Sequence, residues 1–279
     1  MTAILGGLGA AVCWTVTTLC SSRASRRIGA GPALAWVMLV GLAVVLPFLV
    51  TAGSPPTGST AGWLLLAGLG NVVGLMLEYL AVRVGKIGVV AAIVSTEGVM
   101  TALISRIAGE PMPASTAAVL ALIAVGVVLA CLEESEGVDS GRVTRAVVLA
   151  AGGALSFGIS LYSIGHVSGD VAVAWVALPA RVIGVGVITL PLAVGGRLRI
   201  ARSSAPLVIG AGVAEVVGIA AFAWGARDAI GVASVLGAQF AAFSAVGAFV
   251  LFKERLRRIQ VVGVVAILVG VGTLALLSS

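Results

Sequence analysis

The chain has 279 residues, of which 60% are apolar and only 10% are charged, whereas about 25% of the residues in an ordinary soluble domain are charged. A soluble protein of this size could not cover so much apolar surface with polar groups. The composition therefore excludes a soluble enzyme, a nucleic-acid-binding protein and a disordered scaffold. The net charge of +6 comes from basic residues in short loops between apolar segments, a pattern typical of membrane proteins.

Ten apolar segments are long enough to cross a bilayer as helices, which takes about 20 residues. The predicted spans are residues 3–20, 33–51, 61–82, 87–107, 114–132, 146–164, 171–195, 206–226, 229–252 and 259–277. Spans 3 and 4 are separated only around Gly85, and spans 8 and 9 only around Asp228, so we expect two tight helical hairpins. The segments are continuously apolar, unlike the alternating strands of a β-barrel. The sequence therefore predicts an all-α, multi-pass protein of the cell membrane with ten transmembrane helices.

The two halves of the chain resemble each other at a nearly constant offset of 144 residues. Residues 67–74 align with 211–218, Glu110 with Glu254, and 123–127 with 267–271. One repeat would cover residues 1–135 and the other 143–279, each with five spans. Because five is an odd number, the second repeat would enter the membrane from the opposite side. Inverted repeats of this kind are common in secondary transporters, with the substrate site near the midplane between them.

This organisation resembles the EamA type of the drug/metabolite transporter superfamily. The residues that carry the resemblance are 79–83, the helix 88–109, Glu110 and Gly126 in the first half, and 222–226, Glu254, Gln260, Gly263 and Gly270 in the second. The resemblance covers essentially the whole chain and implies a transporter without specifying its substrate. Members of this family usually carry a proline about 13 residues before the glutamate, where this chain has Glu97 and Ala241.

Ionisable residues inside the predicted spans are the strongest functional signal, because a charge in the bilayer needs a partner, a cavity or a function. Glu97 lies near the centre of its span and is the first candidate for proton coupling; Glu78 is the second. A carboxyl in this setting can exchange protons near neutral pH, so that proton and substrate compete for one site. Alternatively, Glu97 is a neutral or Arg181-paired structural residue, and Glu78 forms a salt bridge at the interface.

Further polar and aromatic residues within the spans are candidates for substrate binding. They are Arg181, Glu215, Asn71, Gln239, Trp14 and Trp224. An arginine can clamp a substrate carboxylate with two hydrogen bonds, or it can pair with Glu97 or Glu215 as a structural bridge. For Asn71 and Gln239 the alternative is hydrogen bonding between helices. We expect Glu110, Glu254 and His166 to have structural or interfacial roles.

No nucleotide-binding loop, metal-ligand cluster or nucleophile motif is evident, so we expect no cofactor and no ATP-driven transport. We predict a secondary active transporter, specifically a proton-coupled exporter of small metabolites or drug-like compounds working by alternating access. The expected partners are a small-molecule substrate, protons and membrane lipids, with no nucleic acid, in a monomer or a homodimer. The alternatives are an integral-membrane enzyme that handles lipids and a structural membrane subunit. The loops are short and carry no evident acid–base or metal-binding residues, which argues against the enzyme. The charged residues inside the spans argue against a purely structural subunit.

Basic residues are distributed very unequally between the two sides of the predicted membrane topology. The loops that join spans 1–2, 3–4, 5–6, 7–8 and 9–10 hold Arg23, Arg26, Arg27, Arg83, Lys86, Arg142, Arg145, Arg197, Arg199, Arg202, Lys253, Arg255, Arg257 and Arg258. The opposite side holds only Arg106 and Arg227. The positive-inside rule therefore places both termini outside the cell, whereas the family resemblance implies both termini inside. We favour the charge rule.

Overall fold

The computed structural model describes residues 2–108, 118, 122, 140–165, 167, 171–253 and 258–277. These residues are helical or lie in short connections, and none of them forms a strand. The predicted span at 114–132 lies outside the described residues, apart from two isolated positions. Glu110, Glu254 and His166 also lie outside them. The described part of the chain thus agrees with the predicted all-α class.

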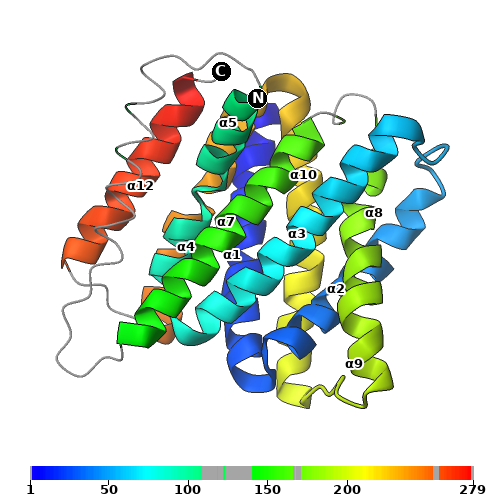
Figure 1. Cartoon of the computed structure of the whole chain (residues 1–279), viewed down its shortest axis with the longest axis horizontal. Coiled ribbons are helices and arrows are strands. Elements are labelled where there is room, and N and C mark those ends of the chain that lie inside the picture. Colours follow the sequence, from blue (N-terminus) through cyan, green and yellow to red (C-terminus); the bar gives the residue numbers. More distant parts are fainter. Residues whose placement is uncertain are drawn as a thin grey trace.

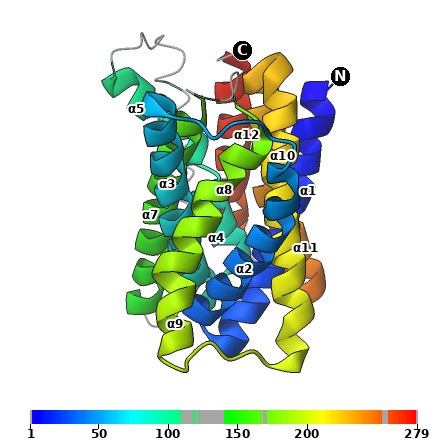
Figure 2. The same cartoon turned by 90° about the vertical axis from the view of Figure 1, so that its right-hand side faces the viewer.

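The first half of the chain contributes a bundle of long helices followed by a broken one (Figures 1 and 2). Its elements are α1 (Thr2–Ile28), α2 (Ala30–Leu49), α3 (Gly58–Val84), α4 (Ile87–Val94) and α5 (Glu97–Ile107). Continuous apolar composition explains why the helices form as they do, because every backbone polar group inside a membrane must be paired within its own segment.

The second half of the chain contains long helices with more interruptions. Its elements are α7 (Ser140–Gly165), α8 (Val173–Gly184), the π-helical η1 (Val185–Thr189), α9 (Leu190–Val194), the 3₁₀-helical η2 (Arg202–Ser204), α10 (Ala205–Ala238), α11 (Phe240–Phe252) and α12 (Arg258–Leu277). The wide turn at η1 directly precedes Pro191, which lacks the N–H of a regular helix.

Among the described residues, six helical segments are long and apolar enough to cross a membrane by length and composition. They are Ile4–Ile28, Ala30–Leu49, Gly58–Val84, Gly141–Gly165, Val173–Val194 and Arg202–Gly225. They correspond to predicted spans 1, 2, 3, 6, 7 and 8. Shorter apolar helices lie at Leu236–Phe252 and Val261–Gly270. The chain is therefore a multi-pass, all-α membrane protein.

Predicted spans 8 and 9 form the expected tight hairpin around Asp228, but the helical pattern continues through the turn. Helix α10 runs through this position to Ala238, in a stretch that contains no proline. The chain nevertheless reverses direction, as shown by Gly218 and Gly237, on which ideal Cβ atoms would both lie within 3.1 Å of the Trp14 ring. Two residues 19 positions apart on a straight helix would be about 28 Å apart. Figure 1 shows the ribbon turning over at the top of the view.

Predicted span 4 is interrupted between α4 and α5, at Ser95 and Thr96. Both hydroxyls donate to carbonyls three residues earlier in the chain, at 2.8 Å and 2.7 Å, and such bonds compete with regular helix formation. The Thr96 N–H likewise donates to Ile93, three residues back. The second half has a matching break at Gln239, whose N–H donates to Leu236. Ser95 and Gln239 are 144 positions apart, the offset found in the sequence.

Helix α4 lies in the centre of the protein. All eight of its residues are buried, and it packs against α7, α11 and α12. A helix that is apolar on every side belongs in the interior of a bundle. The largest cluster of buried apolar residues surrounds it, with contributions that include Met38, Tyr79 and Ile93.

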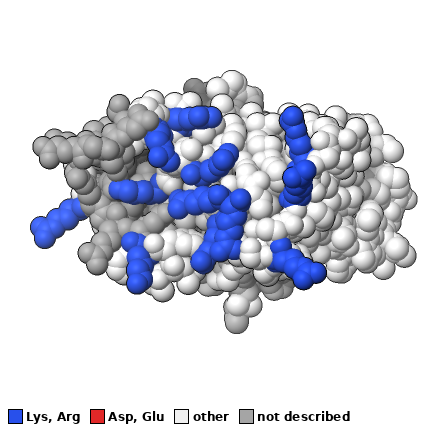
Figure 3. Space-filling view, turned by 90° about the horizontal axis from the view of Figure 1, so that it is seen from below, with Lys and Arg blue, Asp and Glu red and all other residues white. Residues whose placement is uncertain are grey.

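Basic residues gather at one end of the helix bundle. Seen from below, this face carries many Lys and Arg side chains and no visible acidic one (Figure 3). Arg26 donates to the carbonyls of Val82 and Gly85, both at 3.0 Å, at the end of α3. Arg27 donates to the Ser203 carbonyl at 3.1 Å, and the Arg23 guanidinium lies 5.5 Å from the centre of the Phe252 ring. The end of α1 therefore joins α3, η2 and α11 at this face.

Candidate functional site

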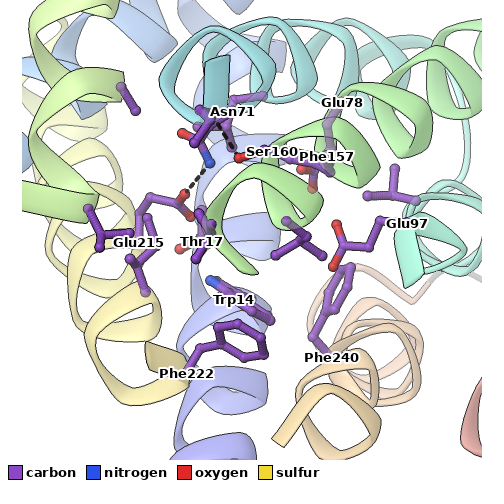
Figure 4. Close-up of a pocket in the computed structure, with 18 of the residues that line it drawn as sticks. Trp14, Thr17, Asn71, Glu78, Glu97, Phe157, Ser160, Glu215, Phe222 and Phe240 are labelled. Atoms are coloured by element: carbon purple, nitrogen blue, oxygen red, sulfur yellow. Dashed lines mark hydrogen bonds between the residues drawn. The ribbon is translucent and has the colours of Figure 1, made fainter. Parts of the chain in front are cut away.

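A cavity lies in the interior, between helices from both halves of the chain (Figure 4). It contains about 820 Å³ of space free of atoms, including open solvent at its mouth. The lining residues are Trp14, Thr17, Thr18, Ala67, Gly68, Asn71, Leu75, Glu78, Val94, Glu97, Phe157, Ser160, Leu161, Ile164, Val176, Ala180, Glu215, Ile219, Phe222, Ala223 and Phe240. The cavity is thus mostly apolar, with a few polar groups in its walls.

Three carboxyl side chains line this cavity from three different helices. Glu78 lies on α3 and is 5% exposed, and Glu215 lies on α10 and is 4% exposed. Glu97 is the first residue of α5 and is partly buried. The structure therefore brings together three glutamates that are far apart in the sequence.

Each of the two deeply buried glutamates has polar partners. The Thr18 hydroxyl donates to Oε1 of Glu78 at 2.9 Å. Glu215 forms an ion pair with Arg181, with 3.4 Å between Nη2 and Oε1, and accepts a long hydrogen bond of 3.5 Å from the Asn71 amide. Buried charges need such partners to offset their loss of hydration. The two glutamates are therefore held in fixed positions.

Glu97 is different, because its carboxyl has no hydrogen-bond or ion-pair partner in the described part of the chain. The break at Ser95 and Thr96 starts a new helix at this residue, and the side chain points into the cavity near Phe240 (Figure 4). The backbone carbonyl of Glu97 accepts a hydrogen bond of 2.9 Å from the Thr101 hydroxyl. Glu97 is therefore the carboxyl most available to a solute or a proton.

Aromatic rings form one wall of the cavity. The ring centre of Trp14 lies 5.8 Å from that of Phe222 and 6.2 Å from that of Phe240, the second pair meeting edge to face. Phe157 of α7 also lines the cavity. These distances are typical of stable aromatic contacts. The wall therefore offers rigid, apolar surfaces close to the carboxyl groups.

The structure does not place every proposed site residue in the cavity lining. Arg181 is fully buried behind it, paired with Glu215 and with its Nη1 3.6 Å from the Met38 sulfur. Gln239 occupies the break between α10 and α11. Trp224 is 45% exposed. The other five proposed residues (Trp14, Asn71, Glu78, Glu97 and Glu215) line the cavity.

Several lining residues were not identified from the sequence. They are Thr17, Thr18, Phe157, Ser160 and Phe240. The repeat offers one indication of Phe157. This residue is 144 positions after Cys13, and Cys13 is next to Trp14, which was proposed from the sequence as a cavity residue. The hydroxyl residues gave no signal, since Ser and Thr occur throughout apolar helices. Ser160, for example, donates to the Ala67 carbonyl at 2.8 Å and so joins α7 to α3.

Glycines on α3 and α10 allow the walls of the cavity to approach closely. A Cβ on Gly74 would lie 2.7 Å from the Phe157 ring, and a Cβ on Gly218 would lie 2.8 Å from Nε1 of Trp14. Small residues allow such close packing of membrane helices. Gly74 and Gly218 are 144 positions apart, and so are Phe157 and Cys13, which lies 3.1 Å from the same Gly218 Cβ position.

The described helices form a bundle with segments that can cross a membrane, and a cavity lies between the two halves of the chain. These two features define the class, which is a multi-pass membrane protein with an internal cavity. Residues 1–132 match the EamA-like transporter family. This match, which covers a little less than half of the chain, confirms the resemblance to the EamA type that the sequence predicts.

Comparison with solved structures gives the same fold over nearly the whole chain. One structure, described as "Crystal structure of protein", has a TM-score of 0.63 and 19% sequence identity, and the match covers 99% of this chain and 96% of that chain. Comparison with curated proteins finds no match.

The groups in this site are suited to non-covalent binding of a small molecule. Carboxyl groups are its only ionisable lining groups, and no cluster of three His, Cys, Asp or Glu in the described residues is arranged to hold a metal ion. The site therefore offers polar contacts, aromatic surfaces and one carboxyl without a partner.

Proposed function

We propose that this chain is a secondary active transporter that binds a small molecule in the cavity and releases it on the other side of the membrane by alternating access. The observation that carries the proposal is the position of the cavity, which is lined by helices from both halves of the chain and holds the unpaired Glu97 carboxyl. Secondary transporters commonly bind their substrates between two repeats near the membrane midplane.

The two halves are proposed to be inverted repeats of five helices each, at residues 1–135 and 143–279. Contacts between equivalent positions support this arrangement. Asn71 contacts Glu215, and Gly74 and Gly218 each face an aromatic ring on the helix that opens the other half. In a repeat related by a two-fold axis, residues close to the axis meet their own equivalents. Rocking of one half against the other would then open the cavity to each side in turn.

Proton coupling is proposed to act through Glu97, with Glu78 as the second candidate. Glu97 has no described partner that would have to be displaced, and its side chain reaches the space that a substrate would occupy. A proton and a substrate that compete for one carboxyl cannot be bound together, and this exclusion is the basis of antiport. Such coupling would make the transporter an exporter driven by the inward proton gradient.

The protein is proposed to reside in the cell membrane with its basic end in the cytoplasm. Positive residues in short loops favour the cytoplasmic side, and the described basic side chains gather at one end of the bundle. Helix α1 begins, and α12 ends, at the other end (Figure 1). Both termini would then lie outside the cell.

The test uses purified protein in liposomes that contain a pH-sensitive dye, challenged in turn with cationic, zwitterionic, neutral and anionic small solutes. We expect proton movement that depends on at least one solute class, and its loss in Glu97→Gln. Arg142→Gln, which removes an exposed charge at the basic end, serves as the control and should retain it. A protein that moves no proton with any solute class would contradict coupled transport. Full coupling in both Glu97→Gln and Glu78→Gln would remove the proposed role of these two carboxyls.

A further inference from the structure

We infer that the cavity selects organic cations: monovalent amines or quaternary ammonium compounds that carry an aromatic or bulky apolar group. This inference rests on the proposed function, because it names the substrate class of the same site. It is carried by two features of the lining, namely its balance of charges and the position of its aromatic rings.

The charge balance of the lining is negative. Glu78, Glu97 and Glu215 line the cavity, and no Lys or Arg does so. Arg181 offsets only one of these charges, because it is fully buried behind the lining and paired with Glu215. Glu78 and Glu97 have no cationic partner in the described part of the chain. A bound monovalent cation would balance one of them, and a proton on the other would leave the cavity neutral.

The same lining disfavours an anionic substrate. It would face three carboxyl groups and find no free cationic side chain among the lining residues. Arg181 could reach an anion only by leaving Glu215, and this would leave a buried carboxylate without its charge partner. Removing one partner from a buried ion pair is strongly unfavourable. The geometry therefore argues against the use of Arg181 as a clamp for substrate carboxylates.

The aromatic wall suits a cation with an apolar body. Trp14 contacts both Phe222 and Phe240, and the Glu97 carboxyl points toward Phe240 (Figure 4). Aromatic faces attract ammonium groups, tryptophan most strongly, and the attraction increases when water is excluded. A metal ion or a strongly hydrated small cation gains little from such a wall. A ring-bearing ammonium compound can contact the carboxyl and the rings at the same time.

The test measures binding of radiolabelled benzyltrimethylammonium to the purified, full-length protein and its displacement by three unlabelled compounds of similar size. Unlabelled benzyltrimethylammonium should compete fully. Neopentylbenzene, its neutral isostere, and phenylacetate, an anion, should compete at least about tenfold more weakly. This series uses only the wild-type protein, so it does not depend on the folding of any variant. Equal competition by the neutral isostere, stronger competition by the anion, or no saturable binding of the cation would overturn the inference.

Two variants then locate the site. Glu97→Gln should weaken binding of the cation about tenfold or more, and Phe240→Leu should weaken it severalfold. Phe243→Leu is the matched control, because Phe243 is three residues along the same helix and is 40% exposed outside the cavity. Unchanged binding in both cavity variants would contradict the assignment to this cavity.

The inference and the proposed function fail in different ways. Proton movement driven only by anionic or neutral solutes would overturn the preference for cations and leave the transporter proposal intact. Saturable cation binding that depends on Glu97, without solute-dependent proton movement, would support the preference and overturn coupled transport.

Discussion

The side-chain amide of Asn71 donates a hydrogen bond of 3.5 Å to the carboxylate of Glu215, a residue 144 positions later in the chain. The same offset separates the matching segments of the two proposed repeats, so these two residues would be equivalent positions that meet in the interior. One of them is neutral and the other acidic. The acidic one is further held by Arg181 of α8, 3.4 Å away. The two halves therefore contribute different chemical groups, a neutral amide and a carboxylate, at this contact.

The first prediction concerns the buried pair of Arg181 and Glu215. Arg181→Met should destabilise the folded protein by about 3–5 kcal/mol, because it leaves a buried carboxylate without its charge partner. The double variant with Glu215→Met should recover most of the lost stability, since both charges are then absent. Thermal unfolding of the purified protein in detergent measures both effects, with Arg142→Met as an exposed control. A double variant that is no more stable than the single one would show that the pair is not a structural unit.

The second prediction concerns the close packing at Gly74 and Gly218. Alanine at either position should destabilise the protein by about 1–3 kcal/mol, because each new Cβ would lie within 3 Å of an aromatic side chain. Gly186→Ala is the matched control, since a Cβ there meets no atom within 4 Å. The measurement is the melting temperature of each of the three variants, compared with that of the wild-type protein. Equal melting temperatures would mean that the aromatic rings move aside without cost.

Much of the fold could be predicted from the sequence, because a continuous apolar segment has few alternatives to a membrane helix. Predicted spans 1, 2, 3, 6, 7 and 8 correspond to the six long apolar helices. The breaks were not predicted, because Ser95 and Thr96 interrupt a helix only through hydrogen bonds that depend on local geometry. The tight hairpin expected around Asp228 agrees with the reversal between Gly218 and Gly237, but composition alone did not predict that the helical pattern continues to Ala238.

The cavity was partly foreseen, because an ionisable residue in an apolar segment needs a special environment. This argument identified Glu78, Glu97 and Glu215, which all line the cavity; their proposed roles in transport stay predictions. It could not decide whether Arg181 faces a substrate or a glutamate, because that choice depends on how α8 and α10 pack. Phe157 and Phe240 carry no charge, so the argument from buried charges could not identify them.

The third prediction contrasts two of the cavity glutamates. Glu97→Gln should leave the unfolding free energy within about 0.5 kcal/mol of wild type, because the carboxyl has no described partner to lose. It should nevertheless abolish coupled transport. Glu215→Gln should destabilise the protein clearly, because Arg181 then keeps its charge without an anion. Expression level, melting temperature and proton-driven transport are measured on the same preparations. A Glu97→Gln protein that unfolds readily would place this residue among the structural ones.

The fourth prediction tests the orientation in the membrane. On a background without Cys13, Cys20 and Cys131, single cysteines are introduced at two exposed serines at opposite ends of the bundle, Ser59 and Ser203. In whole cells, Ser59→Cys should react with a membrane-impermeant thiol reagent, and Ser203→Cys, at the basic end, should not. Both should react after permeabilisation, which controls for accessibility. The reverse pattern would place the termini in the cytoplasm, as the family resemblance implies.

The central position of α4 has a consequence for how motion in this protein can be observed. All eight of its residues are buried, and α7, α11 and α12 pack around it. Its amide protons can reach deuterated water only when the surrounding helices separate or when the neighbouring break at Ser95 and Thr96 opens. Hydrogen–deuterium exchange at α4 therefore reports on rearrangement of the whole bundle, and a bound ligand that holds the bundle in one state would slow it.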